Sequence, residues 1–359
     1  MPNAVIPALN PAPTQASQPV TIADIAREAG VGTATVDRVL NRRAGVNPGT
    51  VERVLQVVAA LGKPQLPGRP KRGANVRFAF VLPAEDTPFV RQVDRHIAQS
   101  AGDFRHQHIT EITLRIATGD PAGFAAALAS TADCEGVAVL GPDLPPVKLA
   151  INELVRGGVH VVTLFSDVAG SMRETHIGAD NRAAGRTAGL LLARMAGRGG
   201  RDTLLLSSQA TRMSAEIERR IGFAQVLEER FPQLRLVRTP DLPASDAAAS
   251  RALLRFLRKG DIDLKRVAGL YNVGIASDGV ARALQSLDIG SEIALVAHDL
   301  SDEHRALLAR GDFAYLLHQD IRYCVLTAAR VLRALCENVR GALNVVQPRI
   351  EILTAENLQ

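Results

Sequence analysis

The sequence predicts an α/β protein in which a small all-helical head precedes a larger domain built from two parallel sheets. Residues 20–62 contain three short helical patterns and no strand pattern. From residue 76 onward, short apolar runs alternate with amphipathic segments, which is the order typical of parallel sheets covered by helices on both faces. About nine such units follow one another, which is more than one open sheet holds, so we expect two lobes.

Length and composition limit the class of protein. The chain has 359 residues, 47% of them hydrophobic, which suits two or three domains with real cores. No apolar run of about 18 residues occurs, so we expect no transmembrane helix and no membrane partner. Residues 1–19 contain five prolines and no basic side chain, which predicts a disordered tail and not a signal peptide. These features predict a cytoplasmic protein.

The positive charge is concentrated at the N-terminus. Residues 1–75 contain nine Lys and Arg against four Asp and Glu, so the whole formal net charge of +5 lies there. Each cation placed on a phosphate releases condensed counterions, so the segment suits a polyanion such as DNA. On charge alone, a merely solvated basic region is the alternative.

Cysteine usage and motifs argue against a metal site and against catalysis. Cys134, Cys324 and Cys336 are widely spread, as expected for reduced, buried thiols in the cytosol. His106 and His108 have no third ligand nearby. The sequence has no phosphate-binding glycine motif, no GxSxG and no HExxH. We therefore expect no metal, no cofactor and no enzyme activity.

The head has the spacing of a helix-turn-helix. Thr21 is a good N-cap, and Asp24 three residues later resembles a capping box. The first helix ends at Gly30, a short turn follows, and a second helix is expected over 33–41. Asn47 caps a third helix that has proline at its first position. In such a fold the second helix enters the major groove.

The expected DNA contacts follow from this placement. Arg38 on the outer face of the second helix can pair with guanine, and the methyl groups of Thr33 and Ala34 can contact thymine. Short polar side chains at helix ends suit phosphate oxygens. They are Thr21, Thr35, Asn41, Asn47 and Thr50.

The pattern T-I-x-D-I-A-x-x-A-G-V-x-x-x-T-V-x-R-V-L-N, starting at Thr21, resembles the head of the lactose-repressor (LacI/GalR) family of transcriptional regulators. The resemblance implies that Thr33 and Ala34, at the start of the recognition helix, read bases. Asp37 stands where the family commonly has Ser. A carboxylate that faces phosphates repels them. We therefore expect Asp37 to pair with Arg38 or a neighbouring Arg, or to accept a hydrogen bond from a cytosine amine.

The linker departs from that family. The family usually has a hinge helix here, but residues 63–75 read KPQLPGRPKRGAN, and three prolines argue against a regular helix. The basic run Arg69–Arg72 either lies along the minor groove as an extended arm or belongs to a flexible linker.

The larger domain repeats strand and helix. The expected strands are 77–82, 109–117, 136–140, 159–165, 203–207, 234–238, 267–271, 293–297, 313–317 and 349–353. The expected helices lie near 88–101, 121–132, 146–157, 182–197, 213–231, 245–258, 276–287, 303–310 and 320–338.

Four motifs extend the resemblance to the family's effector domain, which is similar to periplasmic sugar-binding proteins. They are Thr87-Pro88-Phe89, residues 177–189, Arg219–Phe223 and Leu317–Asp320. The resemblance implies two Rossmann-like lobes with a ligand between them. We expect lobe 1 at 76–176 and 300–333, and lobe 2 at 177–299 and 334–359.

The same resemblance implies the effector contacts. Phe89 packs on a sugar ring, Arg219 donates to hydroxyls or an acidic group, and Gln319 is a polar contact. Ser166 or Asp167 replaces the usual acceptor after the fourth strand. Further cleft contacts are Asn272 and Asp299. The family's carboxylate after 267–271 is replaced by Asn272-Val273-Gly274, which argues against a plain monosaccharide as the effector. A sugar, sugar acid or polyol suits the polar cleft best.

These features together predict a transcriptional repressor whose operator binding is controlled allosterically by a small sugar-like molecule. One head reads only a few base pairs, so we expect a homodimer on a palindromic operator. The alternative is a ligand-independent or nonspecific DNA-binding protein, in which the large neutral domain would add nothing.

Overall fold

The computed structural model describes residues 21–40, 45–61, 74–196, 200–259, 262–287, 292–339 and 345–358. The chain forms two compact units, residues 1–69 and 70–359, which we describe separately. The predictions for the tail, for Asn41 and for most of the linker lie outside the described residues. None of the helices in the described ranges is long and apolar enough to cross a membrane.

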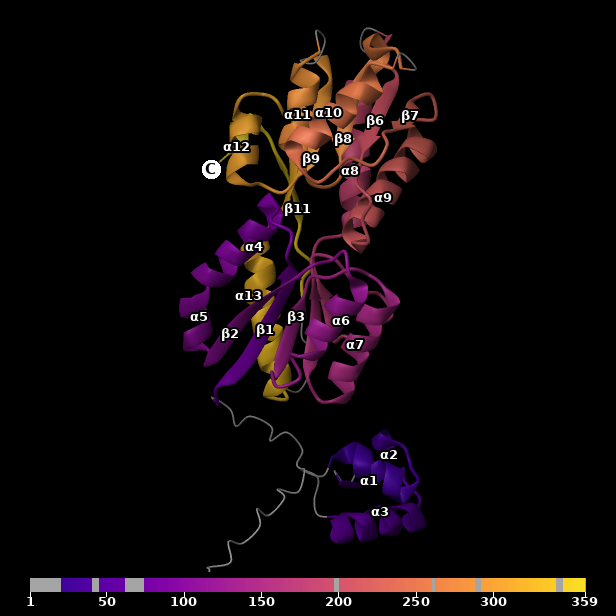
Figure 1. Ribbon diagram of the computed structural model, residues 1–359, viewed down its shortest axis with the longest axis vertical. Helices are drawn as coiled ribbons and strands as arrows, with labels where there is room; N and C mark the ends of the chain where they lie inside the picture. Colours follow the sequence, from indigo (N-terminus) through magenta and orange to yellow (C-terminus); the bar gives the residue numbers. More distant parts are fainter. Residues whose placement is uncertain are drawn as a thin grey trace, which may run out of the picture. The chain divides into compact units, whose positions relative to one another are not determined.

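The first unit is a helix-turn-helix of three helices (Figure 1). They are α1 (Ile22–Ala29), α2 (Thr33–Leu40) and α3 (Pro48–Leu61). The capping box of Thr21 and Asp24 starts α1, and Gly30 ends it in the left-handed conformation with φ 64°. The side chains at helical spacing form one core, made of Ile25, Ala26, Ala29, Val36, Val39, Val54 and Val58.

The first lobe of the second unit has a five-stranded parallel sheet in the order β2-β1-β3-β4-β5. Its strands are β1 (Val76–Pro83), β2 (Ile109–Ile116), β3 (Gly136–Val139), β4 (His160–Leu164) and β5 (Thr175–Ile177). Its helices are α4 (Pro88–Gln99), α5 (Ala101–His106), α6 (Pro121–Ala129), α7 (Pro145–Arg156) and α13 (Ile321–Cys336). The short elements α5 and β5 were not predicted from the sequence.

Alternation along β1 explains the two layers of helices. Phe78 and Phe80 belong to the core shared with α4 and α13, whereas Ala79 and Val81 belong to the core shared with α6 and α7. Successive side chains of a strand point to opposite faces, so a strand covered on both sides is apolar throughout.

The second lobe has a six-stranded sheet in the order β11-β10-β9-β8-β6-β7, parallel except for the edge strand β11. Its strands are β6 (Thr203–Ser207), β7 (Arg235–Arg238), β8 (Val267–Asn272), β9 (Ala294–His298), β10 (Tyr315–Gln319) and β11 (Ile350–Leu353). The helices α8 (Asn181–Met195) and α9 (Ser214–Arg230) cover one face. The other face carries α10 (Asp246–Leu257), α11 (Ser277–Gln285) and α12 (Asp302–Ala309). The described part of this lobe also contains two short 3-10 turns, η2 (Leu264–Arg266) and η4 (Ala355–Asn357).

The predicted lobe boundaries at residue 300 and residue 333 are corrected by the sheet topology. β10 pairs in parallel with β9, and Phe313 and Leu316 are buried in the core of the second lobe. The chain therefore returns to the first lobe only after β10, where α13 begins. α13 then stays with the first lobe as far as Cys336. Figure 1 shows α13 packed behind the sheet of the first lobe.

Candidate functional site

The exposed face of α2 carries the side chains predicted to read bases. Thr33, Ala34 and Arg38 are exposed, while Val36 and Val39 on the opposite face are buried in the core of the head. This arrangement leaves one face of the helix free for another molecule, as an element that enters a DNA groove requires.

The predicted phosphate contacts are divided between exposed and half-buried positions. Thr21 Oγ1 donates to Asp24 Oδ2 at 2.6 Å and accepts from the Asp24 amide at 3.2 Å. Asn47 Oδ1 accepts from the Gly49 amide at 2.9 Å. Thr21 and Asn47 therefore already act as helix caps, although both are exposed, and Thr35 and Thr50 are half-buried.

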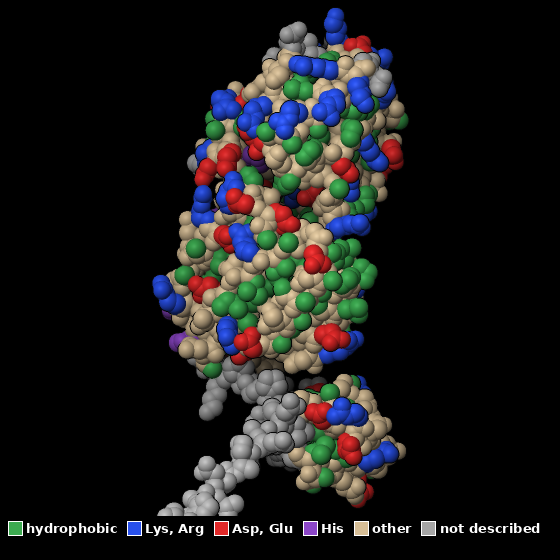
Figure 2. Space-filling view, in the orientation of Figure 1, with side chains coloured by type: hydrophobic (Ala, Val, Ile, Leu, Met, Phe, Trp, Pro, Cys, Tyr) green, Lys and Arg blue, Asp and Glu red, His purple; other side chains and the backbone are tan. Residues whose placement is uncertain are grey.

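The second unit contains a cavity of about 710 Å³ lined by both lobes. The lining comes from the carboxyl ends of strands and the segments after them, at β1, β2, β3 and β4 in the first lobe and at β6, β7, β8, β9 and β10 in the second. Since the carboxyl ends of parallel strands meet at one edge of each sheet, the loops of both lobes converge on the same space. Figure 2 shows a hollow at the boundary between the lobes, with acidic and basic side chains beside it.

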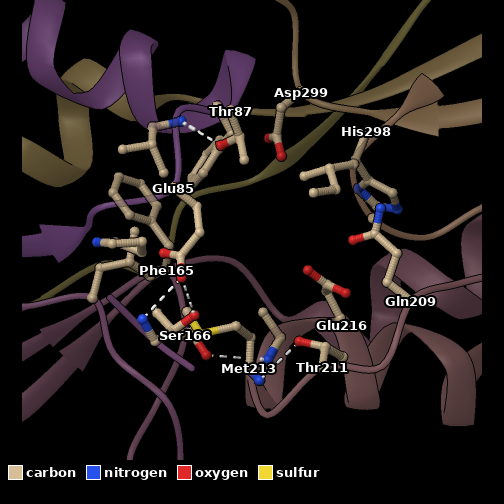
Figure 3. Close-up of a pocket in the computed structure, with 18 of the residues that line it drawn as sticks. Glu85, Thr87, Phe165, Ser166, Gln209, Thr211, Met213, Glu216, His298 and Asp299 are labelled. Carbon is tan, nitrogen blue, oxygen red and sulfur yellow. Dashed lines mark hydrogen bonds between the residues drawn. The ribbon is translucent and has the colours of Figure 1, made fainter. Parts of the chain in front are cut away.

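Five of the seven predicted effector contacts line this cavity, namely Phe89, Ser166, Arg219, Asp299 and Gln319. Phe89 packs edge-on against Phe165, with ring centroids 5.1 Å apart and planes at 85°. The two rings form an apolar wall on the side of the first lobe. Phe165, labelled in Figure 3, faces the cavity.

Arg219 is the centre of a polar set on the side of the second lobe. Its Nε donates to Asn181 Oδ1 at 2.8 Å, and its Nη1 donates to the Val273 carbonyl at 3.4 Å. Its Nη2 lies 3.8 Å from Asp299 Oδ2. Gln319 Nε2 donates to Asp299 Oδ1 at 3.4 Å, so the three predicted residues form one connected group.

Asp167 and Asn272, also predicted as effector contacts, do not line the cavity. Asp167 forms an ion pair with Arg173 and accepts from Thr163 Oγ1 at 2.8 Å. Burial opposes the shift, but these hydrogen bonds lower the pKa of Asp167. Asn272 accepts from Ser207 Oγ at 2.8 Å and donates to Ser277 Oγ at 2.9 Å. The structure therefore gives both residues a role in holding loops.

Sequence reasoning missed Glu216 and Gln209, which also line the cavity. Glu216 Oε2 and Gln209 Nε2 are shielded from solvent and have no hydrogen-bond partner among the described residues. Burial raises the pKa of Glu216, although Arg219, Arg220 and a hydrogen bond from Thr211 act in the opposite direction. The available signal was spacing, because Glu216 lies three residues before Arg219 and hence on the same face of α9.

His298 is a further lining residue that was not predicted as a contact. Its Nε2 is hydrogen-bonded to the hydroxyl of the buried Tyr271. Burial lowers the pKa of His298 well below its usual range, so the ring is neutral near pH 7. A neutral imidazole adds a polar group to the cavity without adding charge.

The backbone of the cavity loops is held in an uncommon conformation. Phe165, Ala276 and Asp299 line the cavity with φ values of 57°, 61° and 59°. Residues other than glycine rarely adopt this left-handed backbone conformation. Such residues cluster at binding sites, where the surrounding structure imposes the geometry.

Two groups of contacts join the lobes on either side of the cavity. Arg91 and Arg95 on α4 form ion pairs with Glu303 and Asp302 on α12, at 2.8 and 2.9 Å. At the other side, Ser214 Oγ at the start of α9 donates to the Asp167 carbonyl at 2.7 Å. Any change in the angle between the lobes must alter these contacts.

The described part of the chain has no group of three or more His, Cys, Asp or Glu side chains placed to hold a metal ion. The cavity combines an aromatic wall with a set of hydrogen-bonding side chains. Such a site can bind a small molecule that has one apolar face and several polar groups.

Two families match the chain in adjoining segments. Residues 21–62 match the lacI family of bacterial regulatory proteins. Residues 78–339 match the periplasmic binding protein domain. A comparison with curated proteins found no match.

Solved structures share the fold of the second unit. One is a putative LacI transcriptional regulator from Bacteroides fragilis, with 18% identity, a TM-score of 0.69, and coverage of 79% of this chain and 98% of that one. Another is the glucose-galactose binding protein GanP from Geobacillus stearothermophilus, with 19% identity, a TM-score of 0.67, and coverage of 79% and 99%. A third is a solute-binding protein from Burkholderia graminis in complex with D-arabinose, with 17% identity, a TM-score of 0.71, and coverage of 80% and 98%.

The order of the parts is that of a regulator and not of an enzyme, because a DNA-binding head precedes a ligand-binding domain. The chain belongs to the periplasmic binding protein domain family and, with its lacI-family head, is a LacI-type DNA-binding regulator.

Proposed function

We propose that the protein is a cytoplasmic transcriptional repressor that binds a palindromic operator as a homodimer and responds to a sugar or sugar derivative. The observation that carries the effector part of this proposal is the cavity between the lobes. It brings Phe89, Arg219, Asp299 and Gln319 together from distant parts of the sequence.

The DNA part of the proposal rests on α2. Its exposed face offers one guanidinium, Arg38, and two small side chains, Thr33 and Ala34. Arg38 donates to guanine, and the small side chains contact thymine methyl groups. One head contacts too few base pairs for selectivity in a genome, so two heads on two half-sites are required.

The effector part rests on the chemistry of the cavity. A volume of about 710 Å³ lies within the usual range of small-molecule sites. An aromatic wall beside buried amide, carboxylate and guanidinium groups suits a ring with hydroxyls on its edge. Two of the structures with the same fold are described as a glucose-galactose binding protein and a complex with D-arabinose, which supports this class.

Coupling between the two parts follows from the contacts across the cavity. A ligand that contacts both lobes favours one angle between them, and a change in that angle alters the separation of two heads in a dimer. The coupling free energy between a ligand site and a second binding site is typically about 1–3 kcal/mol.

A thermal-shift screen of sugars, sugar acids and polyols tests the effector part. A ligand at about 100 times its Kd adds ~2.7 kcal/mol of stability. We expect the shift to disappear in Arg219→Ala and in Gln319→Ala. A shift that survives both substitutions undiminished places the effector elsewhere.

Binding to promoter fragments near the protein's own gene tests the DNA part. At physiological salt, we expect much tighter binding to one such fragment than to random DNA of equal length. Equal affinity for both contradicts the proposed operator binding.

A further inference from the structure

Two polar atoms in the cavity lack partners, and both face the same space. In the described part of the chain, four shielded side-chain atoms have no hydrogen-bond partner, and two of them are Glu216 Oε2 and Gln209 Nε2. Figure 3 shows the carboxylate of Glu216 pointing into the cavity, with Gln209 beside it. Leaving a buried polar group unpaired costs about 1–3 kcal/mol, so this pair marks a position where another molecule completes the hydrogen bonds.

The shielded charges of the cavity do not balance. Its carboxylates away from solvent are those of Glu216 and Asp299, and the shielded guanidinium is that of Arg219. Arg219 already contacts Asp299, Asn181 and the Val273 carbonyl. Glu216 makes no ion pair with any described residue, so when it is ionised the shielded lining holds two carboxylates and one guanidinium.

The absence of a side chain at Gly274 provides the space that the Glu216 side chain occupies. A Cβ on Gly274, in the loop after β8, would lie 3.0 Å from Glu216 Oε2 and 3.6 Å from Gln209 Oε1. The side chains of Glu216 and Gln209 therefore both lie against this loop. A residue with a Cβ at position 274 would crowd them. The loop after β8 has no carboxylate of its own, and α9 supplies one in its place.

Resting on the proposed function, we propose that Glu216 and Gln209 form a subsite that selects effectors by charge. The effector presents a hydroxyl or ammonium donor to Glu216 Oε2 and an acceptor to Gln209 Nε2, and it bears no carboxylate or phosphate at this end. Neutral and amino sugars meet these conditions. Sugar acids do not, because their charge would face a shielded carboxylate that forms no ion pair and has one oxygen without a hydrogen bond.

The first test needs no ligand. The ionisable groups around Glu216 are Arg219 and Arg220 on α9, Tyr271 on β8, and His298 and Asp299 at the end of β9. Because the folded-state pKa of Glu216 is raised above its ordinary value of 4.5, the penalty of the charged carboxylate is absent below that pH. The penalty grows as the pH rises from 4.5 to the folded-state value and is constant above it.

We therefore expect Glu216→Gln to raise the Tm of the full-length protein relative to wild type, with a difference that is small near pH 4.5 and increases toward pH 8. The control is Glu218→Gln on the same helix, since the side chain of Glu218 is 40% exposed and is paired with Arg182 at 2.6 Å. A Tm difference for Glu216→Gln that does not change with pH overturns the claim of a shielded carboxylate without an ion-pair partner.

The second test compares neutral, amino and acid members of three sugar series. Calorimetric titration of the full-length protein would use D-glucose, D-glucosamine and D-glucuronate, the three galactose counterparts, and D-arabinose with D-arabinonate. We expect the neutral or amino member of a set to bind at least about tenfold more tightly than its acid, given the usual strength of hydrogen bonds to charged groups. Glu216→Gln should narrow that ratio, and Glu218→Gln should leave it unchanged.

The outcomes separate this inference from the proposed function. An acid that binds wild type most tightly, or ratios that Glu216→Gln leaves unchanged, overturns the charge-selecting subsite while the sugar-binding cavity stands. If no compound in the panel binds, the sugar-like effector class fails, and the pH dependence of the Tm difference decides the state of Glu216.

Discussion

The backbone of Gly185 on α8 lies directly against the backbone of Arg219 on α9. A Cβ on Gly185 would overlap with the carbonyl oxygen of Arg219, and a Cβ on Gly222 would overlap with that of Arg182 in the same way. The two glycines let the helices meet backbone to backbone, which other residues would prevent. The position of the Arg219 guanidinium in the cavity is thus fixed by a helix pair and not by a loop.

Gly185→Ala should therefore weaken effector binding as well as stability. Overpacking of this kind lowers the free energy of unfolding by about 1–3 kcal/mol. Each kcal/mol lowers the Tm of a domain of this size by about 2–4 °C. Gly102→Ala is the control, because Gly102 is in helix α5 and a Cβ there meets nothing within 4 Å. Thermal unfolding with and without ligand measures both effects. Equal behaviour of the two variants would show that the close approach of α8 and α9 is not required.

Arg38→Ala should relax the base preference at one position of each half-site. The free energy of binding to the preferred sequence should weaken by about 1–3 kcal/mol. Arg27→Ala removes the same charge from α1, where Arg27 is 77% exposed and paired with Asp24, so it should leave the base preference intact. Binding to a set of operators with single substitutions measures both. The assignment of Arg38 fails if wild type and Arg38→Ala show the same flat preference.

Asn41→Ala should weaken binding to all DNA sequences alike, because its predicted partner is a phosphate. The same operator set measures this effect. A loss confined to one base position would instead make Asn41 a base-reading residue.

Arg91→Ala combined with Arg95→Ala should shift the lobes toward arrangements in which α4 and α12 lie apart. Each exposed pair contributes only about 0–1 kcal/mol, so the shift should be partial and should be reproduced by high salt in wild type. Spin labels on Leu149→Cys and Arg258→Cys, one in each lobe, report the distance between them. Arg186→Ala is the control, because its partner Glu229 is in the same lobe. An identical distance distribution in all three proteins would contradict a role for the α4–α12 pairs.

The native thiols should react slowly. Cys134, Cys324 and Cys336 are buried, and burial raises the pKa of Cys134 and of Cys336 to about 11. Relative to an ordinary value of 9.0, the thiolate fraction at pH 8 falls about a hundredfold. Thiol titration before and after unfolding in urea checks this, and fast labelling of the folded protein would contradict it.

The sequence predicts most of the fold because its patterns are periodic and long. The strand β1 is apolar and buried from Phe78 to Pro83, and the capping box at Thr21 marks the start of α1. β5 has only three residues, too few to show a period, and was therefore missed. The boundary placed at residue 300 was wrong because the lobe that a strand joins depends on its pairing with β9, which a local pattern does not contain.

The candidate site was predicted where a motif marked it and missed where only packing did. Phe89, Arg219 and Gln319 belong to recognisable segments, and all three line the cavity. Asn272 looked equally suitable, but its amide is used to hold the loop after β8. Glu216 carries no motif, and its importance lies in one carboxylate oxygen, Oε2, that has no hydrogen-bond partner, which is visible only in three dimensions.

The central claim is that one protein binds a specific DNA sequence and that a ligand in the cavity changes this binding. Fluorescence anisotropy with a fragment selected by the protein from random DNA tests it, compared with a scrambled fragment at physiological salt. We expect a preference of about 10³ or more for the selected fragment. We also expect the tightest cavity ligand to change its Kd by about 5–150-fold in wild type but not in Arg219→Ala. Equal affinity for both fragments, or a ligand effect that Arg219→Ala retains, would contradict the account.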